Sequence, residues 1–223
     1  MQPTRRKLLD YFARMEAHFG PTHWWPGETP FEIAIGAILT QNTAWTNVER
    51  AIAGLKAREL LTADALIAAP LEVVEQAIRP SGYFRQKAVR IRNFSAHLLV
   101  HYAGRIEGMA TRPLQELRAE LLELKGIGPE TADDILLYAV GQPVFVVDAY
   151  TRRIFSRHGL VPGSIKYEAL RAVFERALPH EVPLFREYHG LIVYTGKDFC
   201  RKTPACAGCP LRALLPGGVP CAD

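Results

Sequence analysis

Long apolar runs are missing from this sequence. The longest stretch of its 223 residues without a charge, Ile33 to Val48, contains Gln41, Asn42 and several threonines, and it is too short to span a bilayer. The segment from Met1 to Glu16 carries charges throughout and lacks the apolar core of a secretory signal. We therefore expect a protein that has no membrane segment and is not exported.

Cysteine is scarce and unevenly placed. The four cysteines follow the spacing Cys-x5-Cys-x2-Cys-x11-Cys, at Cys200, Cys206, Cys209 and Cys221. A disulfide framework normally spreads its bridges across a fold and needs an oxidising compartment, and nothing else in the sequence indicates export. Four cysteines so close together in the sequence indicate metal ligation instead.

A strong excess of one charge is also missing. The net charge is +4, from 27 basic and 23 acidic residues, which permits an anionic partner without requiring one. Hydrophobic residues make up 48% of the chain and charged residues 22%, values that are typical of a globular protein.

Apolar residues recur at helical spacing along nearly the whole chain, as in the stripe Leu114, Leu117, Leu121 and Leu124. Thr46 and Glu49 fit a capping box at the start of another helix. Val144 to Val147 is typical of a strand, but it is too short to imply a sheet. The pattern predicts an all-α fold with short connections.

The segment Leu124-Lys-Gly-Ile-Gly-Pro-Glu-Thr-Ala-Asp133 predicts two helices joined by a tight Gly-x-Gly turn. Pro129 lies where the second helix would begin, a position at which its missing N–H is harmless. The free N–H groups at that helix start would suit a phosphate group. An ordinary turn between two helices explains the same pattern, and several acidic residues surround it, with Lys125 the only nearby cation.

Asp148 follows the apolar run Val144 to Val147 and precedes a helix that contains Arg152 and Arg153. It can be a simple N-cap, for which aspartate is favoured, or a catalytic carboxylate. The two roles are compatible, because an N-capping aspartate is fixed in direction and stabilised as an anion by the helix dipole. Arg152 and Arg153 either contact phosphate groups or lie on a solvated face of this helix.

The hairpin, Asp148 and the cysteines, in this order, resemble the endonuclease III family of helix-hairpin-helix DNA glycosylases, from Pro30 to Cys209. Ile38-Leu-Thr-Gln-Asn-Thr43 resembles the helix end whose glutamine, here Gln41, enters the gap left by a flipped base. Ser81-Gly-Tyr-Phe-Arg-Gln-Lys87 resembles the family's second DNA-contacting turn. Asp148 falls on the position of the essential aspartate. The DNA-binding residues that the resemblance implies are Gln41, Asn42, Gly82, Lys125, Gly126, Gly128 and Thr131.

The resemblance also implies an architecture: an all-α, two-domain glycosylase fold with a C-terminal iron–sulfur cluster loop. We expect a six-helix domain with the hairpin over residues 29–140, and a second helical domain formed by residues 1–28 and 141–223. The expected partner is double-stranded DNA that contains damaged bases. We expect a monomeric, cytoplasmic protein, associated with the nucleoid in a prokaryote.

One departure from the family concerns mechanism. Bifunctional members carry a lysine in the second hairpin helix, and this sequence has Glu130 there. A carboxylate cannot form the Schiff base that lyase chemistry needs. The resemblance therefore implies a monofunctional enzyme in which Asp148 supports water attack or stabilises an oxocarbenium-like sugar, on a nucleotide flipped out of the duplex.

The resemblance implies a 4Fe–4S cluster, held by Cys200, Cys206, Cys209 and Cys221. The first three cysteines fit the family spacing with one residue deleted. Cys221 follows a longer interval that contains Pro-Gly-Gly, and this puts the fourth ligand in doubt. Zinc, or an incomplete site, remains an alternative.

Trp24-Trp-Pro26, the phrase Ala37-Ile-Leu-Thr-Gln-Asn-Thr-Ala-Trp45 and the missing lysine resemble the endonuclease III-like 3-methyladenine glycosylases. This implies excision of alkylated purines in a base pocket lined by Trp24, Trp25 and Trp45. Trp24 and Trp25 can instead be core residues. Two other functions stay open: excision of oxidised pyrimidines with weak or no lyase activity, and DNA binding through the hairpin without catalysis.

Overall fold

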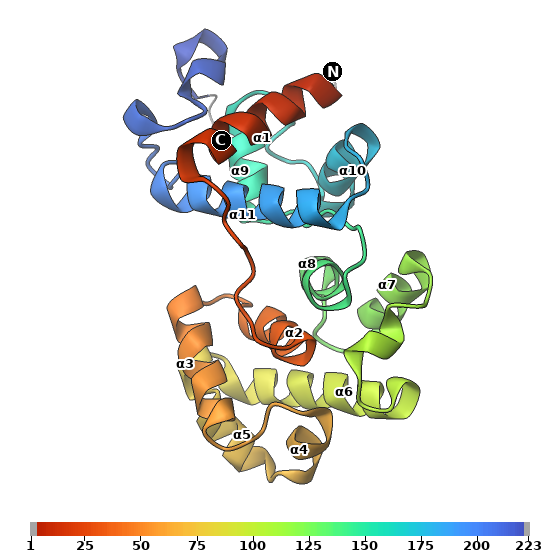
Figure 1. Ribbon diagram of the computed structural model, residues 1–223. Coiled ribbons are helices and arrows are strands. Elements are labelled where there is room, and N and C mark those ends of the chain that lie inside the picture. The colour runs from red at the N-terminus through yellow and green to blue at the C-terminus, as the bar shows by residue number, and fades with distance from the viewer. Residues whose placement is uncertain (1–3, 221–223) are drawn as a thin grey trace. The chain divides into compact units, whose positions relative to one another are not determined.

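The computed structural model describes residues 4–220, and every regular element in that range is helical (Figure 1). The prediction of an all-α fold is therefore confirmed. The chain divides into two compact units, Pro26–Gln142 and the combination of Met1–Trp25 with Pro143–Asp223. We call the first the hairpin unit and the second the terminal unit. Within the described residues, no helix has the length and apolar character that crossing a membrane requires.

The hairpin unit is a bundle of short helices around α2. Its helices are α2 (Pro30–Leu39), α3 (Trp45–Lys56), α4 (Ala63–Ala68), α5 (Leu71–Ala77), α6 (Phe84–Tyr102), α7 (Leu114–Glu123) and α8 (Pro129–Asp134). α8 continues into a π-helical turn, Ile135–Val140. α2 is the centre because it is apolar on nearly every side and buries Ala34, Ile35, Ile38 and Leu39 completely. Thr29 caps it by accepting the N–H of Glu32 at 3.1 Å, and Pro30 occupies its first position.

The terminal unit joins the two ends of the chain. Its helices are α1 (Arg5–Phe19), α9 (Ala149–Arg157), α10 (Tyr167–Ala177) and α11 (Val182–Asp198), and three short 3-10 turns follow α11. α1 and α11 lie side by side although they are far apart in sequence (Figure 1). Aromatic side chains fill the core between the helices: Phe145 and Phe174 stack with ring centroids 4.1 Å apart, and Tyr188 donates to the carbonyl of Leu8 at 2.7 Å.

One local sequence expectation needs correction. Thr46 and Glu49 do not form a capping box, because α3 begins at Trp45 and its N-cap is Ala44, two residues before Thr46. Glu49 instead accepts the indole N–H of Trp45 at 3.0 Å. Val144 to Val147 is buried but forms no strand, and this agrees with the expectation that it is too short for a sheet.

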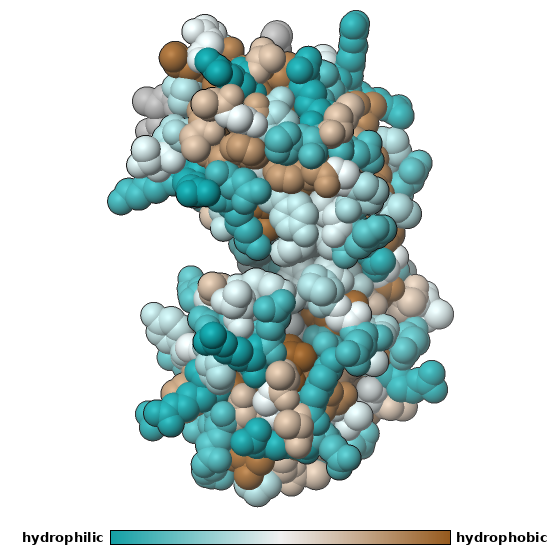
Figure 2. All heavy atoms as spheres, turned by 60° about the vertical axis from the view of Figure 1, so that its left-hand side comes forward, coloured by the Kyte–Doolittle hydropathy of each residue, from teal (hydrophilic) through white to brown (hydrophobic). Residues whose placement is uncertain are grey.

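On the face shown in Figure 2, hydrophilic side chains dominate, and apolar residues reach the surface in separate patches.

Candidate functional site

The Gly-x-Gly turn has the predicted form. α7 ends at Glu123, and α8 begins at Pro129 with Gly128 as its N-cap. Gly126 has φ +93, a conformation that side chains disfavour, and a Cβ there would overlap the side chain of Arg90. Gly128 instead faces open space, so another backbone or a phosphate can approach it closely. Acidic side chains near the turn would repel an anion, so the turn would attract one mainly through its backbone N–H groups.

Gln41 lies just beyond the end of α2, and the hairpin holds its side chain. Its Nε2 donates to the carbonyl of Gly126 at 3.0 Å and to the hydroxyl of Thr131 at 2.9 Å, and its Oε1 accepts from Arg90. The structure thus brings together three residues that the resemblance named separately. Asn42, the next residue, is exposed and has φ 53.

Lys87 connects the helix end before Gln41 to the second turn. Its side chain is buried, and its ammonium donates to the carbonyls of Leu39 at 2.8 Å and Ser81 at 2.6 Å. Burial, together with the nearby charge of Arg90, lowers the pKa of Lys87 to about 8. A single buried side chain therefore fixes two segments that resemble the DNA-contacting segments of the family.

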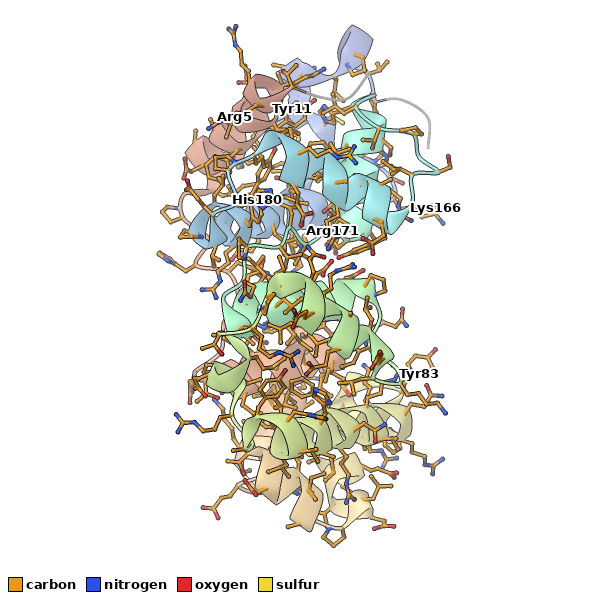
Figure 3. All side chains as sticks on the ribbon, turned by 90° about the vertical axis from the view of Figure 1, so that its right-hand side faces the viewer. Arg5, Tyr11, Tyr83, Lys166, Arg171 and His180 are labelled. Atoms are coloured by element: carbon orange, nitrogen blue, oxygen red, sulfur yellow. The ribbon has the colours of Figure 1, made fainter. Side chains whose placement is uncertain are left out.

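The second turn presents an aromatic side chain. Gly82 has φ 67 and Tyr83 has φ 46, and the Tyr83 side chain is 66% exposed at the start of α6 (Figure 3). Left-handed backbone at a tyrosine is uncommon and is maintained by the surrounding structure. Gly82 and Tyr83 thus form an exposed tip on the hairpin unit.

Asp148 caps α9 in the terminal unit. Its Oδ1 accepts the backbone N–H of Thr151 at 2.7 Å and the Thr151 hydroxyl at 2.8 Å. The backbone N–H of Asp148 donates in return to the Thr151 hydroxyl at 3.3 Å, which completes a capping box. The interpretation of Asp148 as an N-cap is therefore correct. The capping bonds are made to Oδ1 and do not involve Oδ2. The Nε2 atom of His189 lies 3.8 Å from Oδ2.

The surroundings of Asp148 favour its charged form. Burial raises the pKa of Asp148, but His189 and the two hydrogen bonds from Thr151 outweigh burial, so the pKa lies below its usual value. The group is an oriented carboxylate that is ionised at neutral pH. It is suited to accept a proton or to stabilise a developing positive charge.

The three tryptophans are divided between the two units. Trp24 packs against α11, where a Cβ at Gly190 would overlap it, and Lys197 lies 5.1 Å from the centre of its ring. Trp25 is half-buried beside it, with the ring centroids 6.1 Å apart. Trp45 begins α3 in the hairpin unit. The base pocket that we predicted from these three residues stays a prediction.

The cysteines follow α11. Cys200, Cys206 and Cys209 line one cavity, and Pro220, the residue before Cys221, lines it too. Cys221 itself lies outside the described residues. Burial raises the pKa of the Cys209 thiol, and the neighbouring Cys206 and Cys200 raise it further.

Arg157 on α9 supports this loop. Its guanidinium donates to the sulfur of Cys200 at 3.6 Å and to the carbonyls of Arg201 at 2.6 Å and Lys202 at 3.1 Å. Three thiols around one cavity with an N–H donor to sulfur fit a thiolate-bound cluster. Between residues 4 and 220, however, no three His, Cys, Asp or Glu side chains are arranged to hold a metal ion.

Known proteins resemble the chain over most of its length. Residues 35–180, which include the hairpin and Asp148, match the HhH-GPD superfamily of base excision DNA repair proteins. The putative DNA repair glycosylase MJ1434 of Methanocaldococcus jannaschii is 44% identical over 207 residues, 92% of this chain and 90% of the relative.

Two solved structures are similar at comparable identity. One is a trapped covalent intermediate of endonuclease III with DNA, with a TM-score of 0.82 and 26% identity over 97% of this chain and 98% of that one. The other is the H. pylori 3-methyladenine DNA glycosylase (MagIII) bound to 1,N6-ethenoadenine, with a TM-score of 0.76 and 27% identity over 87% of this chain and 98% of that one.

The all-helical fold, the Gly-x-Gly hairpin and the capped aspartate define a helix-hairpin-helix DNA N-glycosylase. The chain belongs to the HhH-GPD superfamily of base excision DNA repair proteins, and it is an endonuclease III-like member. The resemblance drawn from the hairpin, Asp148 and the cysteine spacing is thereby confirmed.

Three side chains with contacts at the site were not identified from the sequence: Arg90, Thr151 and His189. Thr151 alone carries a readable signal, because it stands three residues after an N-capping aspartate. Arg90 and His189 make contacts with residues far away in sequence, which helical periodicity does not predict. Lys87 ends the segment that resembles the second turn, but its buried contacts were not predicted.

Proposed function

We propose that this protein is a monofunctional DNA glycosylase that flips damaged bases out of double-stranded DNA and releases alkylated purines, such as 3-methyladenine. The observation that carries the proposal is the ionised carboxylate of Asp148, fixed by Thr151 at the start of α9. A carboxylate in this state stabilises the positive charge that the sugar develops as the base departs, and it can direct a water molecule to the anomeric carbon.

The proposed DNA contacts lie in the hairpin unit. The backbone at Gly126 and Gly128 binds a phosphate, with Lys125 and Thr131 at its sides. Gln41 and Asn42 fill the space left by the flipped nucleotide, and Gly82 contacts the same duplex. Backbone and helix-terminus contacts of this kind position DNA without reading its sequence. The protein would act as a monomer.

Monofunctional chemistry follows from Glu130. This exposed carboxylate occupies the position of the lyase lysine in bifunctional relatives, and it cannot attack the sugar as an amine. Release of the base then leaves an intact abasic site.

Alkylated purines suit a site whose main catalytic group is one carboxylate. Alkylation of a ring nitrogen makes the base cationic, so the glycosidic bond is already weak and the departing base needs no general acid. A cationic base also gains roughly 1–3 kcal/mol from stacking and cation–π attraction on indole rings. We assign Trp24, Trp25 and Trp45 to this role.

The cysteine loop is proposed to hold a 4Fe–4S cluster through Cys200, Cys206, Cys209 and Cys221. When bound, such a cluster would fix the fold of the loop and help to position DNA; it supplies no step in base release. Arg157 would donate to the sulfur of Cys200 and keep the loop attached to α9.

A panel of duplexes with single lesions tests the substrate. We expect faster release of methylated purines than of thymine glycol, strand breaks only after alkali, and a loss of activity on alkylated DNA in Trp25→Ala and Trp45→Ala. Preferred release of thymine glycol would replace the substrate assignment with oxidised pyrimidines, an alternative supported by the similarity to endonuclease III. Binding without release of any base would indicate a non-catalytic protein.

A further inference from the structure

The two oxygens of the Asp148 carboxylate have different surroundings. Oδ1 is occupied by the two hydrogen bonds from Thr151. Oδ2 makes no contact with Thr151 and faces Nε2 of His189 at 3.8 Å. Oδ2, the oxygen that does not accept the capping bonds from Thr151, is thus the one beside His189.

His189 is placed there by the fold. It lies in the middle of α11, and α11 packs along α9, the helix that Asp148 caps. The residue is 4% exposed, so its ring cannot turn freely into water. Capping α9 requires only Asp148 and Thr151, and an apolar side chain of similar size would fill the same space. The imidazole places a polar ring beside Oδ2 of Asp148, which an apolar side chain would not do.

The distance between the two side chains sets the type of interaction. At 3.8 Å, Nε2 and Oδ2 are too far apart for a hydrogen bond of ordinary length, but they are close enough for a substantial electrostatic interaction in a buried site. A polar ring at this place adds to the hydrogen bonds from Thr151 in offsetting the cost of holding a largely buried carboxylate, and an aliphatic side chain would not contribute.

We propose that His189 is a positioning residue for base release: it directs Oδ2 of Asp148 and maintains the carboxylate in its ionised form. The inference rests on the proposed role of Asp148. In this arrangement Thr151 fixes the carboxylate through one oxygen, and His189 prepares the other for the developing charge on the sugar. No proton needs to pass between His189 and Asp148. The lowered pKa of Asp148 supports this division of roles, since His189 and Thr151 are the groups that oppose the effect of burial.

The test is the pH dependence of base release in single-turnover reactions with two variants. His189→Leu keeps the volume but removes the polar ring, and His189→Gln places an amide nitrogen near the position of Nε2. The substrate is alkylated duplex DNA, or a thymine glycol duplex if the wild-type protein prefers that lesion. Binding to abasic-site DNA and the melting temperature are measured for each variant.

For His189→Leu we expect about a tenfold lower plateau rate and an acid limb displaced to higher pH by about one unit, which is 1.4 kcal/mol. Affinity for abasic-site DNA should stay within about twofold. His189→Gln should recover most of the rate and return the acid limb toward its wild-type position. If His189→Leu does not fold, the comparison of His189→Gln with His189→Asn, whose shorter amide cannot reach, takes its place.

An unchanged plateau rate and acid limb in a folded His189→Leu variant would overturn the inference, and a lower melting temperature alone would show that the histidine only packs. The variant Asp148→Asn, measured in parallel, separates a failure of the role of His189 from a failure of the proposed function. If Asp148→Asn is inactive while His189→Leu behaves as wild type, the role of His189 is wrong and the proposed function stands. If Asp148→Asn retains full activity, the proposed function itself fails.

Discussion

Thr151 donates two hydrogen bonds to the same oxygen of Asp148, from its backbone nitrogen at 2.7 Å and from its hydroxyl at 2.8 Å. The same hydroxyl accepts the backbone N–H of Asp148 at 3.3 Å. One threonine thereby stabilises the start of α9 and fixes the carboxylate in direction. In this protein the helix cap and the proposed catalytic group are the same side chain.

Thr151→Val should weaken both roles, because it keeps the branched shape and removes the hydroxyl. We expect a loss of about 1 kcal/mol in the free energy of unfolding, the usual net contribution of a hydrogen bond, because the hydroxyl bonds are lost while the backbone N–H still donates to Asp148. The pKa of Asp148 should rise, so base release, which needs the ionised form, should be lost at a higher pH on acidification. Chemical denaturation and pH–rate profiles measure the two effects. Thr151→Ser is the matched control, and an acid limb that is identical in Thr151→Val and wild type would contradict the account.

The same linkage gives the pH dependence of stability. The pKa of Asp148 is lower in the folded protein than in the unfolded chain, so the carboxylate contributes stability above its unfolded pKa. This contribution is lost as the pH falls through the lower, folded value. Asp148→Asn should therefore flatten this part of the stability curve under acidic conditions, measured by thermal unfolding between neutral and acidic pH.

Lys87→Met should destabilise the hairpin unit. It removes the donor from the carbonyls of Leu39 and Ser81, which then stay buried without this partner. We expect a loss of about 1–3 kcal/mol in the free energy of unfolding, together with weaker DNA binding, because both adjoining turns lose their support. Lys56→Met is the control: this lysine pairs with Glu28 and Glu32 near the surface and should change stability much less than Lys87→Met. Equal effects of the two variants would contradict the role of Lys87.

Borohydride should not trap a covalent complex between the wild-type protein and DNA. Glu130 offers no amine, and Lys87 is buried. Glu130→Lys should restore weak trapping only, since a lyase lysine also needs a lowered pKa. Efficient trapping by the wild-type protein would identify another amine. Loss of this trapping in Lys125→Ala would then assign the reaction to Lys125 and favour a bifunctional enzyme.

A 4Fe–4S cluster in the cysteine loop would make the purified protein coloured. We expect about four irons per chain, and the colour should be lost in Cys206→Ser or Cys209→Ser. Because Arg157 donates to the backbone carbonyls of Arg201 and Lys202, which these substitutions leave in place, α9 should keep its fold in these variants. Metal analysis and absorption spectra provide the measurement, and a colourless protein with stoichiometric zinc would reject the cluster.

Features coded by neighbouring residues were predictable from the sequence. The hairpin could be placed because Gly126 and Gly128 permit a tight turn and Pro129 suits the first position of a helix. The cap at Asp148 follows from one favourable residue before an amphipathic helix. The same local reasoning failed at Thr46, where the helix begins at Trp45 instead.

Contacts between distant residues were not predictable. Arg90 reaches Gln41 across 49 positions, and His189 reaches Asp148 from another helix. Neither residue stands out in a helical pattern, since an arginine is typical of a solvated face and a histidine in an apolar helix is typical of a core. Only the packing of helices shows that they surround proposed functional groups.

The most direct measurement of the central claim is base release by Asp148→Asn. Asparagine is as good an N-cap as aspartate, so this variant removes the negative charge and should preserve α9. We predict at least a hundredfold slower release of the damaged base, a loss on the order of that seen when a key electrostatic group is removed from an active site. Binding to abasic-site DNA should stay the same or become tighter, because a negative charge leaves a phosphate-rich interface. Base release at the wild-type rate by a folded Asp148→Asn protein would contradict the account and leave Asp148 with the role of a helix cap alone.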